Sequence, residues 1–159
     1  MKTVTATALA GALLLAGPLA APAAAQTILD HADPEVVADI ARGFGSVDLT
    51  TDPVGDPMIL GRIDGTRYAL YFYGCTDGGN CNTLLFTAYW EGAPENAMEA
   101  VNTWNSEKLF GKAYVDNDGD LGLDMALTLD GGVTRANLDD WFDWWRLILR
   151  EYETEVAGR

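Results

Sequence analysis

The stretch from residue 121 to residue 129 alternates strictly between two kinds of side chain. Leucine or methionine occupies every odd position, whereas the even positions hold Gly122, Asp124, Ala126 and Thr128. Successive side chains of a strand point to opposite faces, so this period of two predicts a strand with one buried and one water-facing side. Such strands are typical of antiparallel sheets that are covered on a single face.

Three other segments have the spacing of amphipathic helices, which would cover the apolar face of that sheet. The first follows the cap Asp33 and the N1 residue Pro34, the second begins near Pro94, and the third follows a cap at Thr134. Expected strands occupy residues 46–51, 58–63, 66–74, 82–90, 109–115 and 121–129, and the expected apolar stripe of the second helix is Ala97, Met98, Val101 and Trp104. The sequence therefore predicts a two-layer α+β domain in the order helix, three or four strands, helix, two strands, helix.

The charge balance excludes several classes of partner. The chain has 159 residues, with 24 Asp and Glu against 10 Lys and Arg, and its net charge is −14. Nucleic-acid binding needs Lys and Arg to displace counterions from phosphates, and anionic lipid attracts basic segments. We therefore expect neither nucleic acid nor an anionic membrane as a partner.

The first 25 residues have the organisation of a secretory signal peptide. Lys2 gives a short positive region, residues 8–21 are mostly Ala, Leu and Gly, and Ala23-Ala24-Ala25 supplies small residues for cleavage. This predicts a mature domain of residues 26–159 in the periplasm or outside the cell, without a membrane span. Cleavage would also remove Lys2 and leave the mature chain one charge more acidic.

The two cysteines, Cys75 and Cys81, enclose a turn-rich loop between two expected strands. In an oxidising compartment such a pair predicts a structural disulfide. A redox-active dithiol is the alternative, but those usually have the spacing C-x-x-C at a helix N-terminus.

No set of residues indicates a particular reaction, so we expect no catalytic residue and no cofactor. The only histidine, His31, lies in the lead-in, and neither serine is in a G-x-S-x-G motif. The acidic run Asp116, Asp118 and Asp120 could hold calcium weakly, but an EF-hand alignment would place Met125 at the position that needs Glu. A hairpin turn explains that run better.

Several aromatic and amide residues remain as candidates for binding or for structure. Asn102, Trp104 and Asn105 form an N-x-W-N block at the end of the second expected helix. Their amides either tie that helix to the following strand or contact a ligand. Trp141 and Trp145 fit the core, whereas Trp144 lies off the main stripe and, with Tyr89, could contact a ligand.

Four blocks of sequence together resemble the YbjN-domain family of bacterial sensory transduction regulators. They are C-T-D-G-G-N-C followed by T-L-L-F-T-A-Y-W, then V-N-T-W-N, L-F-G-K-A-Y-V-D-N-D-G-D-L, and G-G-V-T-R-A-N-L-D-D-W-F-D-W-W. The resemblance spans roughly residues 34–152. It implies a fold similar to type III secretion chaperones, in the order α-β-β-β-α-β-β-α and often dimeric, and it carries over no catalytic residue or cofactor.

These observations favour an exported, non-catalytic module that binds a protein partner or forms a homodimer. The less apolar face of the sheet or the final helix would supply the contact surface. The alternative is a periplasmic protein that binds a small ligand or a cation through Trp144, Tyr89 and the acids between residues 116 and 124. A hydrolase is the third hypothesis, because pairs of carboxylates occur by chance in so acidic a chain.

Overall fold

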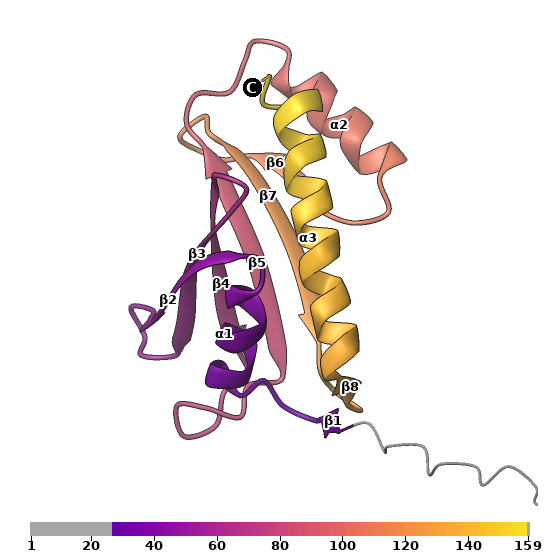
Figure 1. The fold of residues 1–159 in the computed structure, drawn as a ribbon. Coiled ribbons are helices and arrows are strands. Elements are labelled where there is room, and N and C mark those ends of the chain that lie inside the picture. Colours follow the sequence, from indigo (N-terminus) through magenta and orange to yellow (C-terminus); the bar gives the residue numbers. More distant parts are fainter. Residues whose placement is uncertain (1–26, 159) are drawn as a thin grey trace, which may run out of the picture.

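A six-stranded antiparallel sheet and three helices make up the main body of the computed structural model, which describes residues 27–158. The strand order is β2-β3-β4-β5-β7-β6, and the helices cover one face, with α1 and α3 side by side and α2 beside the C-terminal half of α3 (Figure 1). The strands are β2 (Gly45–Thr51), β3 (Pro57–Ile63), β4 (Thr66–Tyr73), β5 (Thr83–Trp90), β6 (Lys112–Val115) and β7 (Leu121–Thr128), and the helices are α1 (Pro34–Arg42), α2 (Ala97–Glu107) and α3 (Arg135–Glu155).

This is the α+β architecture that the sequence predicts, and four strands lie between α1 and α2. The strand expected at residues 46–51 is β2 (Gly45–Thr51), and all seven residues of β2 pair with β3. The expected signal peptide, residues 1–25, lies outside the described residues.

The alternation of β7 has the predicted effect. Leu121, Leu123, Met125 and Leu127 are buried beneath the helices, whereas Ala126 and Thr128 are exposed on the other face. Side chains that are directly opposite each other on paired strands lie on the same face of the sheet. The register therefore determines which residues of each strand face the helices and which face away. The covered face is closed by an apolar core, and the other face is open.

Several aromatic rings pack together between α3 and the covered face. Phe86 of β5 lies 5.0 Å from Phe142 and 5.4 Å from Trp145, measured between ring centroids. Nearer the end of α3, Tyr152 contacts Trp90 at 4.9 Å and Trp104 of α2 at 5.2 Å. Tyr152 is completely buried and its hydroxyl donates to the carbonyl oxygen of Gly122 on β7.

Two expectations about the second helix are wrong in detail. The helix begins at Ala97 rather than near Pro94, and Met98 is 60% exposed instead of contributing to the apolar stripe. Successive side chains of an α-helix point about 100° apart, so Met98 does not lie on the same face as its neighbour Ala97. The following strand is also shorter than expected, because β6 begins at Lys112 and Leu109 is 85% exposed.

On each face of the sheet, a tyrosine ring covers a glycine on the neighbouring strand. Tyr68 of β4 packs over Gly61 on the covered face, and Tyr114 of β6 packs over Gly122 on the open face. A Cβ atom at either glycine would lie within 2.4 Å of the ring, so only glycine permits this approach. The rings replace the side chains that these strand positions lack.

A disulfide joins Cys75 to Cys81 and closes the loop between β4 and β5. Cys81 is completely buried, and its carbonyl oxygen accepts a hydrogen bond from the backbone N–H of Ala32, just before α1. The loop is therefore fixed to the start of the domain as well as to its own hairpin. A short two-stranded sheet, β1 (Ile28–Leu29) with β8 (Val133–Thr134), lies next to it at the same end of the molecule (Figure 1).

Candidate functional site: the open face of the sheet

The open face of the six-stranded sheet is not covered by any of the three helices. Its outward positions form rows across the strands, because each pair in register lies side by side. One row runs through Met58, Tyr71, Leu85 and Ala126, and the next through Leu60, Ala69, Thr87, Asp124 and Lys112. The face therefore presents a continuous surface on which apolar and aromatic side chains alternate with polar and charged ones.

Three large side chains on this face remain strongly exposed. Leu60 is 46% exposed, Tyr73 is 46% exposed and Tyr89 is 59% exposed. Tyr71 is partly buried, and desolvation raises the pKa of its hydroxyl, with smaller contributions from the neighbouring Tyr89, Tyr73 and Asp52. Exposed aromatic residues in one patch are typical of a protein–protein contact surface, since Tyr, Met and Arg are enriched there.

The charge of the open face is opposite in sign to that of the whole chain. Its outward strand positions carry the cations Arg62, Arg67 and Lys112 against the acids Asp48 and Asp124. The remaining acids lie mainly in turns and on the helices. A surface with few Asp and Glu residues is thus set into an acidic molecule.

Asp124 is the centre of a polar network within this face. Its carboxylate accepts hydrogen bonds from Thr87 Oγ1 at 2.8 Å and Tyr114 Oη at 3.1 Å, and forms an ion pair with Lys112 Nζ at 3.2 Å. Tyr114 Oη also lies 3.0 Å from Tyr89 Oη, and because its single proton goes to Asp124, it accepts the proton of Tyr89. Burial of the Tyr114 hydroxyl is the main cause of its raised pKa, followed by the bond to Tyr89 and the charge of Asp124. The network fixes the Tyr114 ring in place.

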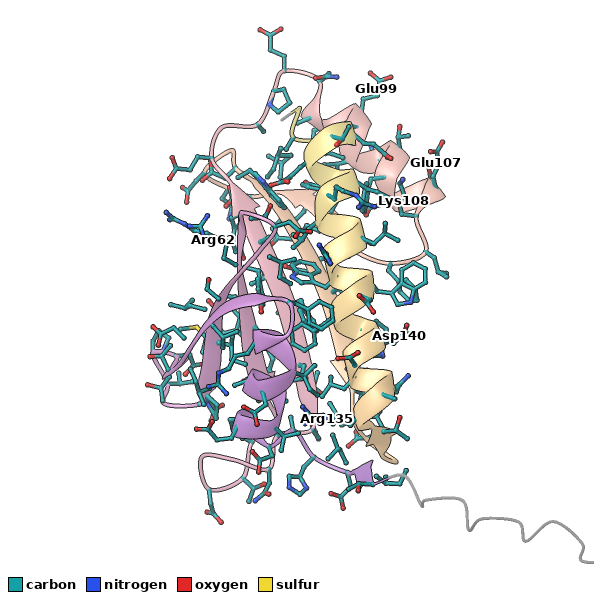
Figure 2. The ribbon with its side chains drawn as sticks, in the orientation of Figure 1. Arg62, Glu99, Glu107, Lys108, Arg135 and Asp140 are labelled. Atoms are coloured by element: carbon teal, nitrogen blue, oxygen red, sulfur yellow. A yellow bond between two sulfur atoms is a disulfide. The ribbon has the colours of Figure 1, made fainter. Side chains whose placement is uncertain are left out.

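Two arginines stand at one end of the open face. Arg62 of β3 and Arg67 of β4 are directly opposite each other in the register, on either side of the hairpin turn Asp64-Gly65. Both line a cavity of about 330 Å³, together with Tyr89, Trp90, Glu91 and Glu153. Arg62 extends away from α3 (Figure 2).

The same hairpin turn is fixed to the helix layer by an ion pair. Arg146 of α3 binds the carboxylate of Asp64 through Nε and Nη2. The hydrogen bond from Arg146, followed by its charge and that of Arg150, lowers the pKa of Asp64. Both side chains are about half exposed to water, so the pair orients the turn and contributes little to stability.

The N-x-W-N block closes one edge of the sheet. The Asn105 amide donates to the backbone carbonyl oxygen of Ala113 at 3.0 Å and accepts from the backbone N–H of Ala113 at 2.9 Å. The Trp104 indole donates to the carbonyl oxygen of Gly111 at 2.9 Å. These contacts tie α2 to the outer edge of β6, whereas Asn102 is exposed.

The two aromatic residues proposed for ligand contact lie on different surfaces. Tyr89 is on the open face, whereas Trp144 is 38% exposed on α3 and packs against Phe110 at 4.8 Å between ring centroids. Trp145 is completely buried, and Trp141 is partly buried against the same Phe110. The structure therefore does not assemble one ligand site from Tyr89 and Trp144.

The acidic run at residues 116–120 forms a tight turn. Asp116 Oδ1 accepts from the backbone N–H groups of Asp118 and Asp120, and Gly119 has a positive φ of 85°. The loop of residues 52–56 repeats this arrangement, with Asp52 Oδ1 accepting from the N–H groups of Val54 and Asp56. The pattern D-x-x-G-D is thus a turn motif that occurs twice in this chain.

Within residues 27–158, no group of three or more His, Cys, Asp or Glu side chains could hold a metal ion. Across the same range, no helix combines the length and the apolar composition that crossing a bilayer requires.

Comparison with known proteins agrees with this fold. A model of the YbjN family, described as "putative bacterial sensory transduction regulator", matches residues 33–157. The chain belongs to the YbjN family. Among solved structures, it is similar to E. coli YbjN, described as "a putative transcription regulator", with a TM-score of 0.51 and 17% identity over 83% of this chain and 90% of that one. No curated protein sequence matched the chain.

The YbjN assignment makes this protein a member of a family described as regulators, and the similarity to E. coli YbjN extends to the fold. The arginine pair was missed by the sequence reasoning, although a signal was available. A two-residue turn at Asp64-Gly65 pairs the residues that flank it symmetrically, which places Arg62 opposite Arg67.

Proposed function

We propose that this YbjN protein is an exported, non-catalytic module that regulates by binding another protein through the open face of its sheet. The observation that carries the proposal is the exposure of Leu60, Tyr73 and Tyr89 on one uncovered face. Large aromatic side chains supply much of the energy of protein interfaces, and their exposure to water is unfavourable without a partner.

Export is supported by two features that are independent of that face. Residues 1–25 have the organisation of a signal peptide, and Cys75 and Cys81 form a disulfide. A fusion of residues 1–25 to alkaline phosphatase, which is active only outside the cytoplasm, tests this part. We expect phosphatase activity, and an inactive fusion would place the protein in the cytoplasm.

Photo-crosslinking tests the binding surface directly. A photoreactive phenylalanine analogue is placed at position 73 on the open face, and in a matched control at position 98 on α2, where Met98 is also exposed. Both variants are expressed in the source organism and irradiated. We expect a discrete crosslinked protein from position 73 and none from position 98. Equal products from both positions, or none from position 73, would contradict the proposal.

A further inference from the structure

Arg62 and Arg67 are placed where sheet stability disfavours them. Arg62 and Arg67 are directly opposite on neighbouring strands, where like charges repel each other. The chain has only 10 Lys and Arg residues in total, and two of them occupy this unfavourable pair of positions. The hairpin uses only part of these two side chains, since Asp64-Gly65 forms the turn, Arg146 of α3 fixes it, and Arg62 adds a single hydrogen bond from Nη1 to Gly65. A role in binding accounts for the remaining donors.

Glu153, which lines the cavity beside them, makes hydrogen bonds within the protein. Glu153 Oε1 accepts a hydrogen bond from Thr66 Oγ1 at 2.7 Å and another from Trp90 Nε1 at 3.3 Å. Arg62 donates from Nη1 to the carbonyl oxygen of Gly65, which holds its guanidinium beside the turn. Both arginine side chains are exposed and line the same cavity, so their remaining donors are accessible to one ligand group.

We infer that this cavity receives the carboxylate of an acidic side chain on the protein partner, an inference that rests on the proposed function. A guanidinium binds a carboxylate through two parallel hydrogen bonds, and a carboxylate between two guanidinium groups relieves their mutual repulsion. Glu91 and Glu153 line the same cavity and would repel a phosphate dianion more strongly than a single carboxylate. The site therefore favours the carboxylate of Asp or Glu over a phosphate group.

The neighbouring side chains specify what surrounds that acid. Tyr89 lines the cavity, and Leu60 lies two residues before Arg62 on the same face. Both are strongly exposed. The recognised segment is thus an acidic residue with aromatic or aliphatic residues next to it, which contact the apolar rows of the sheet while its carboxylate binds the arginines.

The experiment repeats the crosslinking from position 73 in the double variant Arg62→Gln/Arg67→Gln. The control is Arg42→Gln/Arg135→Gln, which removes the same charge at exposed positions on the helix side of the molecule. We expect the crosslinked product to fall about tenfold or more in the first variant and to remain in the second. An unchanged product in Arg62→Gln/Arg67→Gln would overturn the arginine site and leave the open face as a binding surface.

A second arm identifies the ligand chemistry without knowledge of the partner. Random peptides displayed on phage are selected on the purified mature protein and on the Arg62→Gln/Arg67→Gln variant. Peptides enriched on the mature protein alone should contain Asp or Glu beside an aromatic or aliphatic residue. Enrichment of basic or uncharged peptides, or no enrichment at all, would overturn the inference. In the crosslinking experiment, a product the size of two copies of this chain that persists in the variant would also overturn it.

Discussion

The two faces of the sheet have side chains of similar size but different surroundings. On the covered face, Phe86 is completely buried among Phe142, Trp145 and Tyr68. On the open face, Tyr73 and Tyr89 are about half exposed. The same strands carry both sets, so the position of the helices decides which aromatic residues stabilise the fold and which remain for a partner.

Truncation of a core ring should have the largest effect and would test this comparison most directly. We expect Phe142→Ala to lower the free energy of unfolding by about 3–5 kcal/mol, because it leaves a cavity beside Phe86. Tyr73→Ala on the open face should change it by less than about 0.5 kcal/mol. Urea denaturation of the two purified variants measures both values, and similar losses would show that the open face is also part of the folded core.

The polar network of the open face should give an intermediate effect. Asp124→Ala removes the acceptor of Thr87, which is only 2% exposed, and the ion-pair partner of Lys112. We expect a loss of about 2 kcal/mol in the free energy of unfolding. Asp48→Ala, on the same face but exposed, is the matched control and should be nearly neutral. If both substitutions were neutral, the network would be only a surface contact.

Alkaline pH should destabilise the covered face. Burial raises the pKa values of Tyr68 and Tyr152 above the usual value near 10. Above about pH 10 the unfolded chain therefore loses protons that the folded chain retains, and stability falls by up to roughly 1.4 kcal/mol per pH unit for each such tyrosine. Urea denaturation at increasing pH measures the slope. Tyr152→Phe should reduce it, and an unchanged slope would contradict this origin.

The smallest effect concerns a single hydroxyl within the core. Tyr68 Oη is buried and, among the described residues, has no hydrogen-bond partner. Tyr68→Phe removes this unsatisfied group and should be neutral or stabilise the fold by less than about 1 kcal/mol. Tyr152→Phe removes a satisfied hydroxyl, which donates to Gly122, and should destabilise the fold by about 1 kcal/mol. Thermal unfolding of both variants distinguishes them, and equal losses would mean that Tyr68 also has a partner.

The elements of the fold were readable from the sequence because each depends on a local period. The alternation at residues 121–129 and the cap at Thr134 correspond to β7 and to the start of α3. The order of the strands was not readable. β5 pairs with β7 across the whole α2–β6 connection, and the sequence contains no local signal for that long-range pairing.

The candidate site, like the fold, could be predicted from the sequence only in part. The sequence predicted a less apolar sheet face as one possible contact surface, and it singled out Tyr89, which lies there. It could not show that all three helices cover the other face, so it could not rank the open face above the final helix. The N-x-W-N block was noticed from its residue types, but its contact with Ala113 depends on the tertiary position of β6.

The Asn105 amide has a consequence for how copies of this protein can associate. It satisfies the backbone donor and acceptor of Ala113 that an added strand would need, so β6 is closed to strand pairing, whereas β2 is the other edge of the sheet. A protein with two free sheet edges can add a further copy at each edge without limit, whereas two copies that pair through a single free edge leave none for a third. Association by strand pairing at the edges of the six-stranded sheet therefore involves β2 alone and stops at two copies.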